Sequence, residues 1–296
     1  IAIAGAKGGI GKTLTISLLA EGLSRRGLRV LIVDGDLSNS GIVPAFRIPS
    51  GFPSYLQAKS DGAGAWTTDN IRRYIYRHKR TQVAFLLGSE QTSDLNGDVT
   101  WQDWQQLMHA VAGLDEFDVV LVDTGPEFKR RPYSLQVLSM GGWAIFPTPP
   151  GRKERHGAYN ALKFIEAHNT GDVNLLDHCL MLFMEPEKGI PVDAKSIMPK
   201  FAQQFPTSKT LGIMPRSPKQ VAIADEEGDQ YISPLDVSQW SPFSRAVYDL
   251  VDNVCQLTGI EAPLAKPSAN IFQRMFASRR YRHASDLAQR PVVVNQ

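Results

Sequence analysis

One stretch near the start of the chain combines residue types that bind phosphate. Residues 6–13 read Ala-Lys-Gly-Gly-Ile-Gly-Lys-Thr and lie between a short apolar run and a segment with helical periodicity. Glycines let successive backbone N–H groups point inward, and the following helix N-terminus adds the positive end of its dipole. In such loops the lysine reaches the β- and γ-phosphates and the threonine hydroxyl ligates Mg²⁺. We predict nucleotide-binding roles for Gly8, Gly9, Ile10, Gly11, Lys12, Thr13 and Leu14.

Acidic residues directly follow two other apolar runs. Residues 30–33 lead into Asp34 and Asp36, and residues 119–122 lead into Asp123. Because the carboxyl ends of parallel strands meet at one edge of an open α/β sheet, we expect these carboxylates beside the phosphate loop. Carboxylates at that edge serve a metal ion and an attacking water, although any one of them alone could simply cap a helix.

Short apolar runs alternate with helical segments along most of the chain. This alternation is typical of the α/β class, with a mostly parallel central sheet flanked by helices on both faces. Seven runs are predicted as strands, at residues 1–4, 30–33, 83–87, 119–122, 143–146, 179–183 and 211–214.

Four of the intervening segments place apolar residues on one helical face, and Thr100 is a candidate cap for the second of them. The four faces are Ile16, Leu19, Ala20 and Leu23; Trp101, Trp104, Leu107, Met108 and Val111; Ala194, Ile197, Met198, Phe201 and Phe205; and Val247, Leu250, Val251 and Val254.

Periodicity ends after Leu257, where a glycine and two prolines indicate a linker. We therefore predict one α/β domain over residues 1–258 and a basic, partly amphipathic tail over 259–296. Residues 261–296 hold six Lys/Arg and two acids, so this segment carries +4 while the whole chain carries only +2.

Composition narrows the class of protein further. The chain is 43% hydrophobic and 21% charged, and no apolar run approaches the ~18 residues of a membrane-spanning helix. Cys179 and Cys255 lie too far apart for a CxxC site and are too few for a disulfide framework. We expect a reducing, cytoplasmic location. Because the chain begins at Ile1, we also expect a few native residues before it.

Lys7 is a residue that an ordinary phosphate loop does not need. The run Lys-Gly-Gly-Ile-Gly-Lys-Thr over residues 7–13 resembles the deviant Walker A signature of the ParA/MinD family. The resemblance implies a three-layer α/β/α P-loop NTPase that hydrolyses ATP slowly. It also implies that Lys7 joins Lys12 in catalysis by reaching across an ATP-sandwich homodimer to the nucleotide of the other subunit. The alternative for Lys7 is a solvated side chain beside the loop.

The acidic segments resemble the switches of the same family. Asp34-Gly-Asp36 matches the family's Asp-x-Asp but departs from it afterwards, and Asp123-Thr-Gly-Pro resembles the Walker B and second-switch segment. The resemblance implies that Asp36 positions or activates the attacking water. It implies that Asp34 supports Mg²⁺ or its waters, and that Asp123 holds Mg²⁺ through water, together with Thr13.

Two later segments resemble the ParA region that packs on adenine. They are residues 182–184, which end in Met184, and residues 213–225, which include Pro215 and Arg216. A guanine-specific Asn/Thr-Lys-x-Asp motif does not follow these strands, so ATP is favoured over GTP. The resemblance covers residues 1–258.

The family uses ATP to control binding to a surface, and the sequence leaves two surfaces open. One is nonspecific DNA, bound through basic residues brought together by dimerisation. The other is an anionic membrane, bound through an amphipathic helix at residues 269–280, although that helix could equally dock on its own domain or on a partner. The candidate surface residues are Arg152, Lys153, Arg155, Arg274, Arg279 and Arg280.

Further basic clusters at residues 129–131 and 72–80 could add to a DNA surface, but each alone is more typical of a solvated face. The prediction is a ParA-like ATPase that partitions a plasmid or chromosome over nucleoid DNA, with a ParB-like stimulating partner or cargo adaptor. A MinD-like positioning ATPase, peripheral on the inner membrane face, is the alternative.

Overall fold

The protein is described here by a computed structural model. It describes residues 1–5, 7–37, 40–61, 65–88, 99–125, 132–170, 173–186, 193–217, 231, 233, 235 and 241–262. These residues belong to one compact unit, Ile1–Ala262. The predicted tail helix at residues 269–280 lies outside the described residues, and the predicted boundary at residue 258 stays a prediction.

Within the described residues, eight strands form a single sheet in the order β3-β4-β2-β5-β1-β6-β7-β8. Every neighbouring pair is parallel except β3 and β4. The strands are β1 (Ala2–Ile3), β2 (Val30–Asp34), β3 (Tyr76–Arg77), β4 (Ala84–Leu86), β5 (Val119–Asp123), β6 (Ala144–Thr148), β7 (Cys179–Met184) and β8 (Lys209–Met214).

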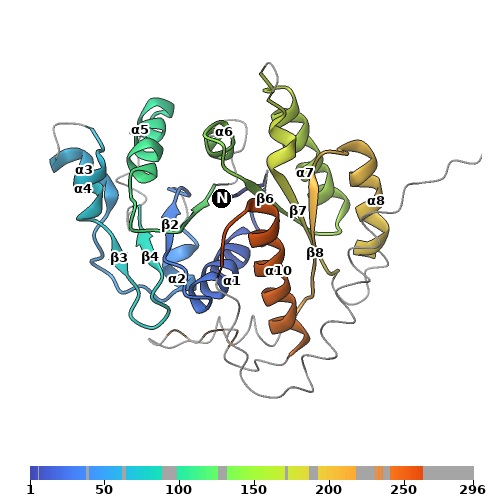
Figure 1. Cartoon of the computed structure of the whole chain (residues 1–296), viewed down its shortest axis with the longest axis horizontal. Helices are drawn as coiled ribbons and strands as arrows, with labels where there is room; N and C mark the ends of the chain where they lie inside the picture. The colour runs from blue at the N-terminus through green and yellow to red at the C-terminus, as the bar shows by residue number, and fades with distance from the viewer. Residues whose placement is uncertain are drawn as a thin grey trace, which may run out of the picture. The chain divides into compact units, whose positions relative to one another are not determined.

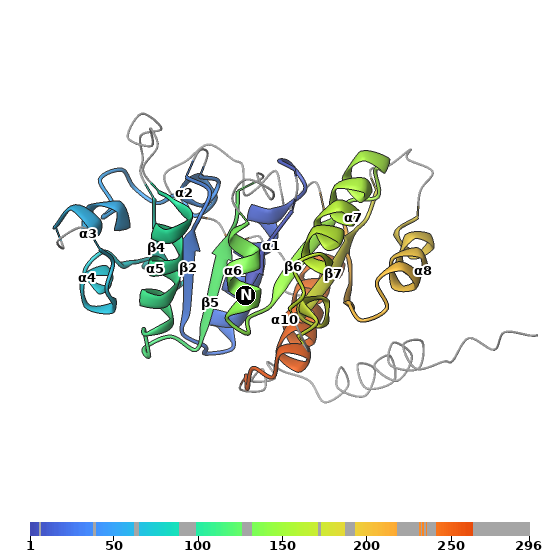
Figure 2. The ribbon, with the colours of Figure 1, turned by 90° about the horizontal axis from the view of Figure 1, so that it is seen from above.

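Helices cover both faces of the sheet (Figures 1 and 2). One face carries α1 (Lys12–Arg25), α2 (Ile42–Ala45) and α10 (Pro242–Thr258). The opposite face carries α3 (Tyr55–Asp61), α4 (Thr68–Arg72), α5 (Trp101–Ala112), α6 (Tyr133–Ser139), α7 (Arg152–Glu166), the 3₁₀ turn η2 (Leu175–His178) and α8 (Ala194–Gln204).

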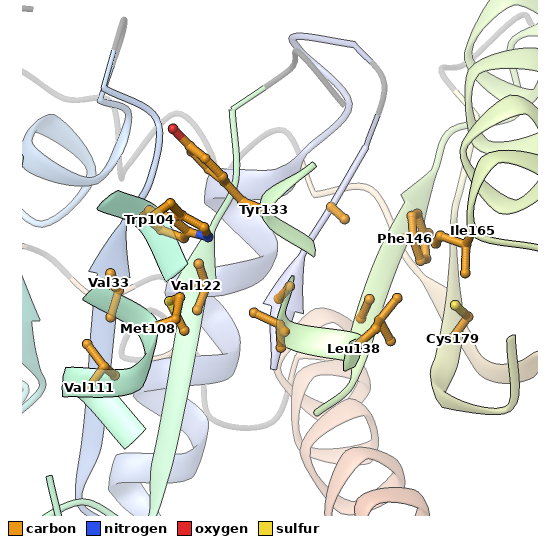
Figure 3. Packing of buried hydrophobic residues seen from close by; sticks show 14 of the residues in the cluster. Val33, Trp104, Met108, Val111, Val122, Tyr133, Leu138, Phe146, Ile165 and Cys179 are labelled. Atoms are coloured by element: carbon orange, nitrogen blue, oxygen red, sulfur yellow. The ribbon is translucent and has the colours of Figure 1, made fainter. Parts of the chain in front are cut away.

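Alternation along the strands builds a separate core on each face. In β2, Leu31 and Val33 pack with the α5 side, whereas Val30 and Ile32 pack with the α1 and α10 side. Because both faces are covered, the inner strands from β4 to β7 in the sheet order are mostly apolar and their central residues are buried. Figure 3 shows side chains of α5 lying against those of β2 and β5. The predicted three-layer α/β/α class is confirmed.

The seven predicted strands are all present, and their ends differ from the predicted ends by at most two residues. The eighth, β3, is a two-residue antiparallel strand at the edge of the sheet. The sequence analysis missed it because it lies in a basic and aromatic stretch without an apolar run. A two-residue strand needs only a pair of backbone contacts and leaves no periodic pattern.

The predicted cap of α5 is present as a full capping box. The Thr100 hydroxyl accepts from Asp103 N at 3.1 Å, and the Asp103 carboxylate accepts from Thr100 N at 3.0 Å. Trp101, which the sequence places on the same apolar face as Trp104, is the first helical residue and remains 39% exposed. The buried face begins at Trp104, which stacks on Tyr133 with ring centroids 3.9 Å apart.

None of the helices in the described ranges has the length and apolar character needed to cross a membrane.

Candidate nucleotide site

The phosphate loop leaves β1 in the interior of the sheet, between β5 and β6, and leads into α1. Gly9 and Gly11 have φ values of 73° and 92°, a left-handed conformation that glycine adopts without strain. Gly11 is the N-cap of α1 and makes no side-chain capping hydrogen bond. The first N–H groups of α1 therefore have no side-chain cap, which leaves them available to an anion.

Apolar side chains anchor the base of the phosphate loop, whose backbone forms a cradle for an anion. Ile10 is buried and Leu14 is partly buried against the core beneath, whereas Gly8 and Gly9 are exposed. Backbone groups therefore face solvent at the loop tip while apolar side chains hold its base. That arrangement suits a ligand bound mainly by main-chain N–H groups.

Lys12 lies inside the loop. Its side chain is only 7% exposed, and its Nζ donates a hydrogen bond to the carbonyl oxygen of Lys7 at 3.2 Å. Burial lowers the pKa of Lys12, and the negative charges of Asp123 and Asp36 act in the opposite direction. The ammonium group is thus held where a phosphate would stabilise its charge.

Asp34 and Asp123 are register partners on the adjacent strands β2 and β5, and both are buried. Burial is the main cause that raises the pKa of each carboxyl to about 7. The negative charges of neighbouring carboxylates also raise both pKa values. The carboxylate with the largest effect on the pKa of Asp123 is Asp34, and the one with the largest effect on the pKa of Asp34 is Asp36. Two adjacent buried carboxyl groups are both ionised only when a cation accompanies them, and otherwise at least one of them binds a proton.

The residues at this edge fit Mg²⁺. The Thr13 hydroxyl donates to Asp123 Oδ2 at 3.4 Å, and the buried Oδ1 atom finds no partner among the described residues. Thr13, Asp34 and Asp123 would hold the ion, which would neutralise phosphate charge. The described residues contain no group of three or more His, Cys, Asp or Glu able to hold a metal by themselves. In phosphate-binding sites, Mg²⁺ usually keeps waters and phosphate oxygens as ligands beside one or two protein groups.

Asp36 lies beside this pair and close to the segment that follows β5. Its backbone N–H donates to Asp34 Oδ1 at 3.2 Å, and a Cβ on Gly125 would lie 3.3 Å from its Oδ1 atom. The loops after β2 and β5 therefore meet at Asp36.

Gly41 is a residue that the sequence analysis missed. A Cβ at this position would lie 2.6 Å from the Thr13 hydroxyl oxygen, so only glycine lets the segment after β2 pass so close to the loop. The available signal was a glycine shortly after the Asp34 segment, but a single glycine in a loop is too common to identify a contact.

Lys7 points away from the cradle that holds Lys12. Its Nζ donates a hydrogen bond to Glu154 Oε1 at 2.7 Å, in the first turn of α7, and its side chain is 49% exposed. No local pattern predicts this contact, because the two residues are 147 positions apart.

The predicted base-pocket residues lie at the carboxyl ends of β7 and β8. Met184 contacts the phosphate loop, since its Cε is 3.2 Å from where a Cβ on Gly11 would be. Pro215 and Arg216 follow β8, and the backbone N–H of Arg216 donates to Glu185 Oε2 at 3.2 Å. Residues 221–225 of the same prediction lie outside the described residues.

Arg152, Lys153 and Arg155 line a hollow of about 630 Å³ between α7 and α8. Tyr159 and Phe201 also line it. Arg274, Arg279 and Arg280 lie outside the described residues, as do residues 129–131.

Two arginines of the basic cluster at residues 72–80 bind other residues of the same chain. Arg72 pairs with Glu116 at 2.9 Å, and Arg80 donates to the carbonyl oxygen of Tyr231 at 2.6 Å. These two side chains are therefore not directed to a DNA surface, which weakens this cluster as a candidate.

Comparison with known proteins agrees with this geometry. Residues 1–169, more than half of the chain, match the family model described as an AAA domain. An ATP-binding protein of Methanocaldococcus jannaschii is 33% identical over 137 residues, which are 44% of this chain and 46% of that protein. The match thus spans about half the length of this relative.

Two solved structures share the fold over most of the chain. The ParA family ATPase of Chlorobium tepidum superposes with a TM-score of 0.66 at 15% identity, covering 84% of this chain and 97% of that chain. The septum site-determining protein MinD of Pyrococcus horikoshii, complexed with Mg-ADP, superposes with a TM-score of 0.66 at 20% identity, covering 89% and 98%. Family match and fold together define the class: the chain belongs to the family of that AAA-domain model and has the fold of the ParA and MinD structures.

Proposed function

We propose that this protein is a Mg²⁺-dependent ATPase that forms an ATP-sandwich homodimer and positions a cargo over nonspecific DNA. The observation that supports the dimer is that the side chains of the two loop lysines lie in different surroundings. Lys12 is buried within its own cradle, whereas Lys7 is half exposed and directed to α7. In this proposal Lys12 serves the nucleotide of its own subunit, and the half-exposed Lys7 serves the nucleotide of a second subunit.

Each further residue has a part in this proposal. The N–H groups of the loop and Lys12 bind the phosphates, while Asp36 orients the attacking water. Met184, Pro215 and Arg216 border the adenine. Positioning and charge stabilisation supply most of the catalysis in phosphoryl transfer, and the sequence shows no arginine finger. Hydrolysis is therefore slow until a partner, such as a ParB-like protein or cargo adaptor, completes the site.

Nucleotide controls the dimer by linkage. ATP shifts the equilibrium towards the dimer only if it binds the dimer more tightly than the monomer. Arg152, Lys153 and Arg155 occupy the α7 turn that also contains the partner of Lys7. A dimer closed around Lys7 would bring two copies of these cations together and bind the DNA backbone in a salt-dependent manner. The protein would then act in the cytoplasm on the nucleoid.

The test is co-sedimentation with nonspecific DNA and, in parallel, with liposomes containing anionic phospholipid. Each mixture contains Mg²⁺ with either ATP or ADP. The proposal expects ATP-dependent binding to DNA that falls as salt rises, and no binding to liposomes. Binding to liposomes alone, lost on deletion of residues 263–296, would replace it with a MinD-like membrane-associated function.

Two variants separate nucleotide binding from dimerisation. Lys12→Ala removes the lysine of the cradle and is expected to lower ATP affinity at least tenfold. Lys7→Ala is expected to leave ATP affinity within about twofold, because the remaining loop contacts are intact, but to abolish the dimer and DNA binding. Titration calorimetry and sedimentation velocity measure the two properties. A Lys7→Ala protein that dimerises with ATP like the parent would refute the sandwich.

A further inference from the structure

The contact between Lys7 and Glu154 joins the phosphate loop to α7 within one chain. The hydrogen bond of 2.7 Å is also an ion pair, with the two side chains 49% and 26% exposed. Glu154 is the one acidic residue in the first turn of α7. The hydrogen bond from Lys7 is the main cause that lowers the pKa of Glu154, so the carboxylate is ionised at neutral pH. The Lys7 charge is therefore already paired within its own subunit.

Gly151 makes room for this contact. A Cβ on Gly151 would lie 2.1 Å from Glu154 Oε2 and 3.1 Å from its Cδ. The carboxylate therefore folds back over the start of α7, where it also faces the positive end of the helix dipole. The backbone of Gly151, with φ −59° and ψ 144°, is open to any residue. A side chain at position 151 would therefore displace the Glu154 carboxylate without straining the backbone.

We propose that Glu154 is a positioning residue that retains Lys7 on its own subunit, so that a nucleotide-bearing second copy must compete for this lysine before the dimer closes. The inference rests on the proposed sandwich dimer and concerns how that dimer is restrained. A triphosphate offers several charged oxygens where Glu154 offers one carboxylate, and so ATP can win this competition. The contact acts as a threshold on dimerisation and leaves nucleotide binding by the monomer untouched.

The size of the effect follows from the exposure of the pair. Partly exposed ion pairs change equilibria by about 1.5- to 5-fold. Closing the dimer breaks one Lys7–Glu154 contact in each subunit. Loss of both contacts is therefore expected to tighten the dimer by up to about 25-fold.

Two variants remove the contact by different means. Glu154→Gln keeps the shape of the side chain and removes its charge. Gly151→Ala keeps both charges and displaces the carboxylate by steric conflict. Glu166→Gln is the matched control, because Glu166 lies at the other end of α7 and pairs with Lys163 at 2.6 Å. Sedimentation velocity with a non-hydrolysable ATP analogue measures the nucleotide concentration at half-maximal dimerisation.

Both Glu154→Gln and Gly151→Ala are expected to lower that concentration, while Glu166→Gln matches the parent. ADP affinity of the monomer is expected to be unchanged in all four proteins, which a general structural disturbance would not produce. The advantage of Glu154→Gln over the parent should also shrink as salt rises, because the pair is screened.

The outcomes separate the two proposals. A parent protein that stays monomeric with the analogue overturns the sandwich function and this inference with it. A parent that dimerises while Glu154→Gln and Gly151→Ala require the same or more nucleotide overturns the inference alone. A shift in Glu154→Gln without one in Gly151→Ala, or an equal shift in Glu166→Gln, identifies a general charge effect and also overturns it.

Discussion

Asp34 and Asp123 show how single residues are prepared for a charged ligand. They face each other across β2 and β5 in an apolar sheet, and both carboxyls have a pKa of about 7 because burial disfavours their anions. Asp123 Oδ1 has no partner among the described residues. The free protein thus carries an unfavourable arrangement that a bound cation relieves, as is common at functional sites.

The pair predicts how stability depends on pH in the absence of metal and nucleotide. Since the folded-state pKa of both groups lies above the ordinary value of 3.8, the folded chain binds more protons than the unfolded chain between pH 4 and 7. Their contribution to stability is therefore present at low pH and lost as pH rises through about 7. Urea unfolding at several pH values measures this loss.

Asp123→Asn provides the control for that titration. It removes one buried charge, so its stability should fall less than that of the parent between pH 5 and 8. At pH 8 it should exceed the parent by about 1 kcal/mol or more, the equivalent of about one pKa unit. Added Mg²⁺ should stabilise the parent more than Asp123→Asn at this pH. Parallel pH profiles in the two proteins would contradict the assignment.

At the scale of elements, the site is made by the ends of strands and the start of one helix. The loop after β1 supplies an N-terminus of α1 without a side-chain cap, and β2 and β5 supply acids at the same level of the sheet. The left-handed glycines then set the path of the loop. Binding depends on this local backbone shape as much as on the side chains.

Gly11→Ala tests the shape of the loop. The φ of 92° and the Met184 Cε atom at 3.2 Å from a Cβ both oppose a side chain at this position. We expect a loss of about 1–3 kcal/mol in the free energy of unfolding, together with weaker ATP binding. Gly8→Ala is the control for stability, since a Cβ there meets nothing within 4 Å, and it should change stability by less than about 0.5 kcal/mol. Urea unfolding compares them, and equal losses would argue against loop strain.

At the scale of the whole molecule, the proposed function is a cycle of association and release. The dimer would form when Lys7 leaves Glu154, bind DNA through the paired α7 surfaces, and separate after hydrolysis. The rate of hydrolysis would then set how long the protein stays on its surface, and a stimulating partner would shorten that time.

Asp36→Ala is expected to hold the protein in the ATP-bound dimer. Asp36 lies beside the Asp34 and Asp123 pair but outside the loop, so its removal should spare ATP binding. The rate of hydrolysis should fall at least about 100-fold, which is the lower end of the loss expected when a general base is removed. The ATP dimer should persist on DNA for hours where the parent dissociates. Phosphate release and dissociation from DNA measure the two effects. Rapid dissociation of the variant with ATP would show that hydrolysis does not control release.

The sequence by itself determined the class of fold and the chemistry of the phosphate loop. Apolar runs and glycines act locally, so 30–33, 119–122 and 6–13 carry their own structural information. The acids after β2 and β5 were also predictable, because parallel strands end at a common edge.

Tertiary structure alone decided which distant residues meet. The pairing of Lys7 with Glu154, the passage of Gly41 over Thr13, and the turn of Arg72 and Arg80 towards their own chain all join segments that lie apart in the sequence. Such contacts depend on the packing of β-strands and helices around a shared core, and no local periodicity encodes them. The physical reason is that the local pattern of a segment determines whether it forms a helix or a strand and which of its faces is apolar. Which other segments pack against that face is determined by the whole fold.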